Sequence, residues 1–102
     1  MTRRLRILEL ASAELEAAVR WYEERRAGLG AEFFDAVAQT VAMLAERPEA
    51  GTAIEGMRST RRVLVRRFPY QIVYHFTPTE ITIAAIAHLK RKPHYWKRRL
   101  TS

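Results

Sequence analysis

Residues 62–88 read RVLVRRFPYQIVYHFTPTEITIAAIAH, and this stretch decides the fold. It contains three runs rich in β-branched and aromatic residues, and two Pro-containing interruptions separate them. Such side chains favour β-strands, whereas Pro with Thr and Glu favours tight turns. The sequence therefore predicts three antiparallel strands, at Arg62–Arg66, Tyr70–Phe76 and Ile81–His88.

The residues before these strands predict two helices and one more strand. Ser12 suits a helix N-cap, and apolar residues then recur at helical spacing, which predicts a helix at about Ala13–Arg26. Two closely spaced glycines allow a reversal, and a second apolar stripe predicts a helix at Ala31–Glu46, which Pro48 ends. A short alternating run, Arg4–Leu10, predicts the first strand.

The predicted order is β-α-α-β-β-β, an α+β fold in which a helical hairpin packs on one face of a small, mostly antiparallel sheet. Residues 1–102 form a single domain, because a chain of 102 residues supports one hydrophobic core. The other sheet face is expected to stay open, to carry the basic side chains, and to be closed at one end by residues 89–102. A domain of this size is also expected to lean on a protein partner for part of its core.

Charge is divided unevenly along the chain. The 18 Lys and Arg and the 11 Asp and Glu give a net charge of +7. Residues 1–57 carry seven basic and ten acidic side chains, whereas residues 58–102 carry eleven basic ones and Glu80 alone. A field of one sign favours binding to a polyanion or an acidic protein over a merely solvated surface.

Composition excludes several classes of site. The chain has no cysteine, so disulfides, zinc-thiolate sites and thiol nucleophiles are excluded. Three scattered His and few acids in the basic half predict no metal site and no cofactor. No apolar run approaches the roughly 18 residues of a membrane span, and the N-terminal residues alternate charge with aliphatics, so a cytoplasmic protein without a membrane partner is predicted.

Several motifs occur in an order that covers nearly the whole chain. They are Trp21-Tyr22-Glu23, Gly30-Ala31-Glu32-Phe33-Phe34, Arg47-Pro48, Arg67-Phe68-Pro69-Tyr70-Gln71-Ile72-Val73-Tyr74, and Ala87-His88 followed by Lys92-Pro93 and Trp96. Together they resemble the RelE/ParE superfamily of bacterial toxins. The resemblance implies the RelE/ParE-like fold and a growth-inhibiting, plasmid-stabilisation type of toxin from a type II toxin-antitoxin pair.

The resemblance also implies the partners. A labile acidic antitoxin wraps the toxin, and operator DNA is contacted only through the toxin-antitoxin complex, which represses its own operon. Members of the superfamily divide between ribosome-dependent mRNA endonucleases, which are RelE-like, and inhibitors of DNA gyrase, which are ParE-like.

RNA cleavage through the 2′-hydroxyl needs a base near that oxygen, cations at the scissile phosphate and an acid for the leaving 5′-oxygen. The resemblance places Gln71 where active RelE-like nucleases carry an arginine. It places Leu64 and Arg62 where these nucleases carry two lysines. Half of that cationic set is therefore missing, which leaves enzymatic activity open.

The C-terminal residues offer looser matches. Lys90 or Arg91 aligns with a second catalytic arginine, and Tyr95 or Trp96 with the terminal aromatic that stacks on the substrate base. His88 ends the last predicted strand, where an imidazole is a candidate general base or acid, although a His at a strand end more often bonds backbone or faces solvent. The candidate catalytic residues are His88, Lys90, Arg91 and Arg67.

Arg66 and Arg67 stand beside the aromatic run Phe68-Pro69-Tyr70. Such a pair of guanidiniums can hold phosphates and stack on bases, or bind the carboxylates of an acidic antitoxin. The predicted nucleic-acid or target-binding residues are Arg61, Arg62, Arg66, Arg67, Lys90, Arg91, Lys92, Tyr95 and Trp96. The predicted antitoxin-binding residues are Trp21, Phe34, Arg66 and Arg67.

Three functions fit these observations. The first is a ParE-like toxin that acts by binding, with DNA gyrase as the target that the family implies. The second, ranked close behind, is a RelE-like endonuclease that cleaves mRNA on ribosomes. The third is a non-toxic basic module that binds nucleic acid.

Overall fold

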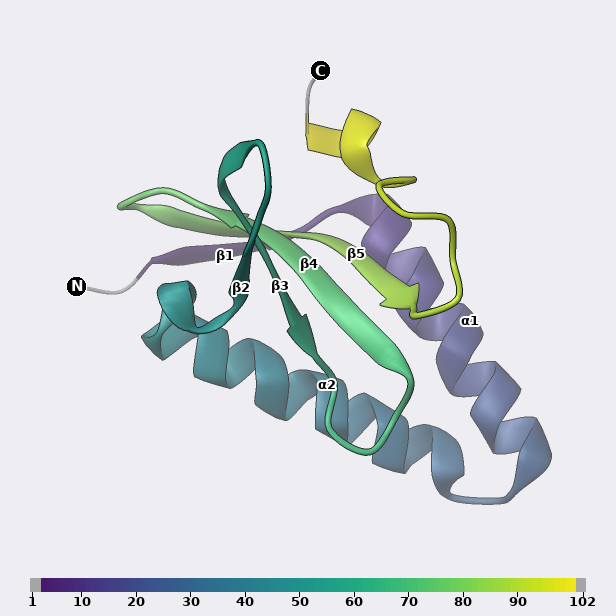
Figure 1. Cartoon of the computed structure of the whole chain (residues 1–102). Coiled ribbons are helices and arrows are strands. Elements are labelled where there is room, and N and C mark those ends of the chain that lie inside the picture. The colour runs from purple at the N-terminus through teal and green to yellow at the C-terminus, as the bar shows by residue number, and fades with distance from the viewer. Residues whose placement is uncertain (1–2, 101–102) are drawn as a thin grey trace.

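The computed structural model describes residues 3–100. In this described part of the chain, two α-helices cover one face of a five-stranded sheet of order β1-β5-β4-β3-β2 (Figure 1). The elements are β1 Arg4–Ile7, α1 Glu9–Arg25, α2 Leu29–Glu46, the 3-10 turn η1 Pro48–Ala50, β2 Thr52–Ile54, β3 Met57–Leu64, β4 Tyr70–Phe76, β5 Glu80–His88 and the 3-10 turn η2 Lys97–Leu100. Within residues 3–100 only β1 and β5 pair in parallel, so the predicted α+β fold with a mostly antiparallel sheet is confirmed.

Helix α1 begins four residues earlier than predicted. Its N-cap is Leu8, and the Ser12 amide lies inside the first turn, where it donates to the Leu8 carbonyl at 3.0 Å. The predicted Ser12 cap is therefore wrong. The reason lies in the sheet, because the Leu8 amide still donates to Ile83 of β5 at 3.0 Å and the chain turns into the helix directly after that bond.

Strand β2 was not predicted from the sequence, and the order is thus β-α-α-β-β-β-β. It is three residues long and lies at the sheet edge, where it pairs with β3 across a turn that contains Gly56 at φ 81°. Strand β3 also begins at Met57 rather than at Arg62. Pairing with β2 on one side and β4 on the other stabilises this Arg-rich segment as a strand despite its modest propensity.

The main core lies between the helices and the sheet. Phe33 and Leu44 of α2 and Ile72 and Tyr74 of β4 are fully buried there. Aromatic rings continue this core to the joining turn of the helices, where the Phe33 and Tyr70 centroids are 4.9 Å apart. The helical hairpin is thereby fixed to the ends of β3 and β4.

The opposite sheet face is only partly open, which corrects the prediction. Val73 and Ala85 on this face are buried with Trp96 from the segment after β5. Figure 1 shows this C-terminal segment leaving the end of β5 and folding back toward the start of α1. The segment is docked because its own Trp96 supplies apolar surface that the small side chains of β5 leave uncovered.

Candidate target-binding site

A cavity of about 390 Å³ lies between β3, β4 and the C-terminal segment. We call it the sheet cavity. Its polar lining comes from Glu55, Arg62, Gln71, Arg91 and His94. Val73 and Trp96 supply part of its apolar wall.

Strand register explains why residues distant in sequence meet in the sheet cavity. Arg62 pairs with Val73 and Leu64 pairs with Gln71, so alternation places all four side chains on the face away from the helices. The segment after β5 then brings Arg91 to the same cavity. The structure thus gathers Arg62, Gln71 and Arg91, three positions that the resemblance singled out.

His88 does not line the sheet cavity. It lies toward the helices, with its ring centroid 5.1 Å from that of Tyr70, and its Nδ1 accepts a hydrogen bond from the Lys90 amide at 3.0 Å. His94 lines the cavity instead, and its ring lies 5.7 Å from that of Trp96. The sequence did not predict His94 as a site residue, because it reaches the sheet only through the folding back of residues 89–100.

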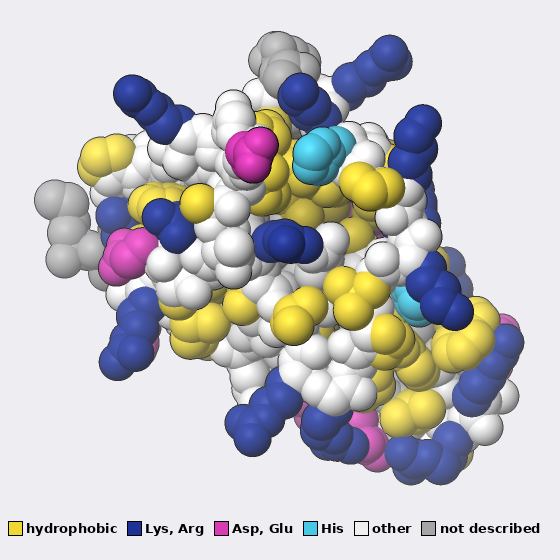
Figure 2. Space-filling model, in the orientation of Figure 1, with side chains coloured by type: hydrophobic (Ala, Val, Ile, Leu, Met, Phe, Trp, Pro, Cys, Tyr) yellow, Lys and Arg dark blue, Asp and Glu magenta, His cyan; other side chains and the backbone are white. Residues whose placement is uncertain are grey.

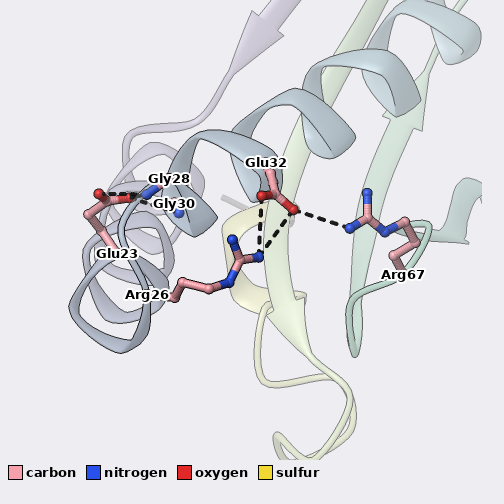
Figure 3. Close-up of polar contacts among 6 residues, drawn as sticks. All are labelled: Glu23, Arg26, Gly28, Gly30, Glu32 and Arg67. Atoms are coloured by element: carbon pink, nitrogen blue, oxygen red, sulfur yellow. Dashed lines mark hydrogen bonds and ion pairs between the residues drawn. The ribbon is translucent and has the colours of Figure 1, made fainter.

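Arg67 lies in the turn between β3 and β4, away from the sheet cavity. Its backbone is left-handed at φ 73°, and its Nη2 lies 3.2 Å from the Glu32 carboxylate of α2. The same carboxylate pairs with Arg26 at 3.2 Å, so two arginines share one charge (Figure 3). The four candidate catalytic residues therefore do not form one constellation around a phosphate.

Arg61 and Arg62 point to opposite faces of β3, because neighbouring residues of a strand alternate. Arg61 Nη1 donates to the carbonyl oxygens of Gly51 at 2.8 Å and Glu49 at 3.3 Å. These bonds hold η1 and β2 against the sheet. Arg61 is therefore half-buried and engaged with backbone near η1, and it does not line the sheet cavity.

The two C-terminal aromatic residues are also engaged inside the protein. Trp96 is 3% exposed, so its ring is not available to stack on a base, which corrects that prediction. The Tyr95 hydroxyl donates to Glu14 at 2.6 Å, and the Arg91 guanidinium lies 3.9 Å from the Tyr95 ring centroid. Burial and the bond to Glu14 raise the pKa of Tyr95 well above its ordinary value.

Basic side chains border much of the surface around the sheet cavity. Figure 2 shows Lys and Arg spread around this face, with acidic side chains sparse. Arg66, Lys90 and Lys92 are exposed and contribute to this field. Among residues 3–100 no group of three His, Asp or Glu is placed to hold a metal ion.

The family model of the ParE toxin of type II toxin-antitoxin systems, parDE, matches residues 5–93. The chromosomal ParDE toxin-antitoxin system from P. aeruginosa has a chain of similar fold, with a TM-score of 0.73 at 18% identity, over 85% of this chain and 96% of that one. An arginine double mutant of E. coli toxin RelE in the free state is similar over 98% and 99% of the two chains, also with a TM-score of 0.73 at 18% identity.

No curated protein sequence matches the chain. Within residues 3–100, neither helix combines the length and the apolar character that crossing a membrane requires. The two solved structures establish a shared RelE/ParE fold, and the family model covers most of the sequence. The chain therefore belongs to the ParE toxin family of type II toxin-antitoxin systems.

Proposed function

We propose that this chain inhibits bacterial growth by binding its target, with DNA gyrase as the target that the family implies, and that it does not cleave RNA. One observation carries the proposal. The face where RelE-like nucleases hold their cations presents Leu64 and Gln71, with Arg62 as the one cation among the three matched positions. Its site of action is the bacterial cytoplasm, where gyrase works.

Leu64 makes this face better suited to a protein than to a scissile phosphate. Its side chain is 66% exposed and lies beside Gln71 in the strand register. Neither an isobutyl group nor a neutral amide can balance charge on a phosphorane or transfer a proton at neutral pH. An exposed leucine next to Arg62 instead offers the mixture of apolar and cationic contact that protein interfaces use.

The lining of the sheet cavity supports a second candidate function. Arg62, Arg91 and His94 line it together, which is a base or acid candidate beside two phosphate-binding cations. An RelE-like mRNA endonuclease would use His94 in this arrangement rather than His88. A non-toxic basic module that binds nucleic acid is the third candidate.

For neutralisation we propose an acidic antitoxin that covers the cationic surface which the target needs. The exposed Trp21 and Phe34, together with Arg66 and Arg67, are its proposed contacts. Operator DNA is contacted through the complex with the antitoxin. Charge complementarity would give this partner both fast association and specificity.

The test is brief induction of the chain in bacteria, with new mRNA 5′ ends mapped across the transcriptome. We expect growth arrest with intact messages, inhibition of supercoiling by purified gyrase, and rescue by the protein of the adjoining gene. Leu64→Glu should abolish both arrest and gyrase inhibition, whereas Arg58→Glu on the same strand should leave them unchanged. New ends phased to codons would establish the endonuclease, and the absence of arrest and cleavage would leave the binding module.

A further inference from the structure

A second cavity, of about 620 Å³, lies on the helix side of the sheet, between α1 and the adjoining ends of β4 and β5. We call it the α1 groove. Its walls are mainly apolar and include Ala17, Ala18, Trp21, Pro69, Tyr70 and Ile86. Figure 2 shows apolar side chains gathered at the lower right, over the ends of α1 and the strands, with Lys and Arg around them. The volume is in the range of roughly 300 to 1,000 Å³ typical of binding sites.

The α1 groove has a cationic rim. Arg91 lines it, and the Arg25 guanidinium lies 3.8 Å from the ring centroid of Trp21. Glu14 is the one carboxylate in the lining among the residues that the structure describes, and Arg99 pairs with it at 2.9 Å. Because that negative charge is balanced inside the protein, the net field at the rim favours an anionic partner.

Ring contacts decide between a nucleobase and an apolar side chain as the occupant. Arg25 lies over the Trp21 ring, so one face of that indole is already covered. Tyr70 meets His88 edge to face at 5.1 Å, so these rings pack on each other instead of offering parallel faces to a base. The rest of the lining is mostly apolar, with Ala17, Ala18 and Ile86 among its residues, and such a surface fits an aliphatic or aromatic side chain.

We propose that the α1 groove receives a large apolar side chain from an acidic peptide, whose carboxylates pair with Arg91 and Arg25. In a ParE-family toxin the partner of this chemistry is the antitoxin, so the inference rests on the proposed function and names the surface that the antitoxin occupies. Trp21, which is 49% exposed, becomes buried in the complex. Hot-spot residues of interfaces are typically aromatic side chains or arginines enclosed in this way.

Arg91 connects peptide binding in the α1 groove to neutralisation of the toxin. It lines both the α1 groove and the sheet cavity, which lie on the two sides of β4 and β5. A carboxylate that pairs with Arg91 from the groove side removes that cation from the sheet cavity. The peptide would therefore weaken target binding without covering the whole sheet face.

The experiment uses the product of the gene that adjoins this one, as the proposed antitoxin. Calorimetry measures the affinity of the toxin and its variants for this purified protein. Trp21→Ser removes the exposed ring, and Ala17→Trp fills the groove while leaving Trp21 in place. We expect each to weaken binding by about 30-fold. Leu10→Ser is the matched control, since Leu10 is 57% exposed on the same helix as Trp21 and lies outside the groove, and it should change affinity by less than about threefold.

The outcomes separate this inference from the proposed function. If the wild type does not bind that protein, the groove assignment and the proposed neutralisation both fail, whereas growth arrest and the supercoiling assay still test the proposed function separately. If the wild type binds and both groove variants bind as tightly as the wild type, the groove assignment alone is overturned. It is also overturned if Leu10→Ser loses as much affinity as Trp21→Ser. A ten-nucleotide oligouridylate that displaces the protein from the wild type but not from Ala17→Trp would assign the groove to nucleic acid instead.

Discussion

At the scale of single residues, Glu14 joins three parts of the chain that are far apart in sequence. Its carboxylate accepts hydrogen bonds from Tyr95 at 2.6 Å, from Arg99 at 2.9 and 3.1 Å, and from the Ile86 amide at 3.0 Å. The side chains of Glu14 and Arg99 are only 16% and 14% exposed, so water screens this pair less than a surface pair. Glu14 therefore adds polar contacts to the docking of the C-terminal segment, whose apolar contact comes from Trp96.

Removing the Glu14 charge should destabilise the fold. We expect Glu14→Gln to lower the free energy of unfolding by about 2 kcal/mol, because it leaves the shielded Arg99 without a counter-charge. Urea denaturation followed by circular dichroism measures the change. Glu16→Gln, at an exposed position of the same helix, is the control and should shift stability by less than about 0.5 kcal/mol. Equal effects of the two variants would show that the Glu14 contacts contribute no stability.

Because of Tyr95, the free energy of unfolding should fall at alkaline pH. Burial and the bond to Glu14 raise the pKa of Tyr95 in the folded state above the value of about 10 that it has in the unfolded chain. The folded state therefore holds the phenolic proton more tightly, so this contribution is complete below pH of about 10 and is lost as pH rises further.

The measurement is the free energy of unfolding between pH 8 and about 11, compared with that of Tyr95→Phe. Burial also raises the pKa of Tyr22, Tyr70 and Tyr74, and the comparison cancels their shared contribution. The variant should start less stable and lose less stability with rising pH. Parallel curves would refute a role for the Tyr95 proton.

Tyr74 is a second residue on which distant backbone depends. Its hydroxyl donates to the Pro48 carbonyl at 2.6 Å and accepts from the Gly51 amide at 2.9 Å, and the ring is fully buried. Tyr74→Phe should cost about 2 kcal/mol, since it leaves these two groups unpaired. Thermal unfolding measures the change, and Tyr95→Phe serves as a comparison because it also loses one hydroxyl. Wild-type stability in Tyr74→Phe would contradict the prediction.

At the scale of elements, the joining turn of α1 and α2 is built for close approach. Glu23 accepts hydrogen bonds from the amides of Gly28 and Gly30, at the N-terminal end of α2 (Figure 3). A Cβ on Gly30 would lie 2.6 Å from the Val19 carbonyl oxygen of α1. The two helices can therefore meet here only because residue 30 has no side chain.

Gly30→Ala should separate the helices. We expect a loss of about 2 kcal/mol in the free energy of unfolding, even though alanine favours a helix, because backbone cannot move aside as a side chain does. Ala31→Ser, at the next and exposed position, is the control. Differential scanning calorimetry measures both, and a gain of stability in Gly30→Ala would disprove the close contact.

At the scale of the whole molecule, the two faces of the sheet carry two different surfaces. The helix side has the apolar α1 groove, and the other side has the polar sheet cavity. Arg91, after β5, borders both. The protein as a whole carries a net charge of +7, so it attracts an acidic partner electrostatically at long range, before any contact forms.

Association with an acidic antitoxin should therefore depend on salt. We expect the association rate to fall by about tenfold or more between 50 and 500 mM NaCl, while the dissociation rate changes by less than about threefold. Stopped-flow fluorescence of the exposed Trp21 reports both rates. An association rate that does not change with salt would mean that the overall charge has no part in the encounter.

Local sequence patterns predicted most elements and failed at their ends. The β-branched run Tyr70–Phe76 matches β4 residue for residue, since its propensity and its burial agree. The start of α1 and the whole of β2 were missed, because pairing with β5 and with β3 sets them rather than any local signal. Arg62 and Arg91, which lie far apart in sequence, line one cavity, whereas Arg61 bonds to the backbone near η1 and Trp96 is buried.

The sequence by itself determined the fold class, the concentration of positive charge in the second half and the resemblance to the RelE/ParE superfamily, since propensity, periodicity and composition are local or additive. Only the tertiary structure decided which face each arginine occupies and that His94 rather than His88 borders the sheet cavity. It also decided that Glu14 fixes the C-terminal segment. These features rest on contacts between residues as far as 85 positions apart, which no local pattern encodes.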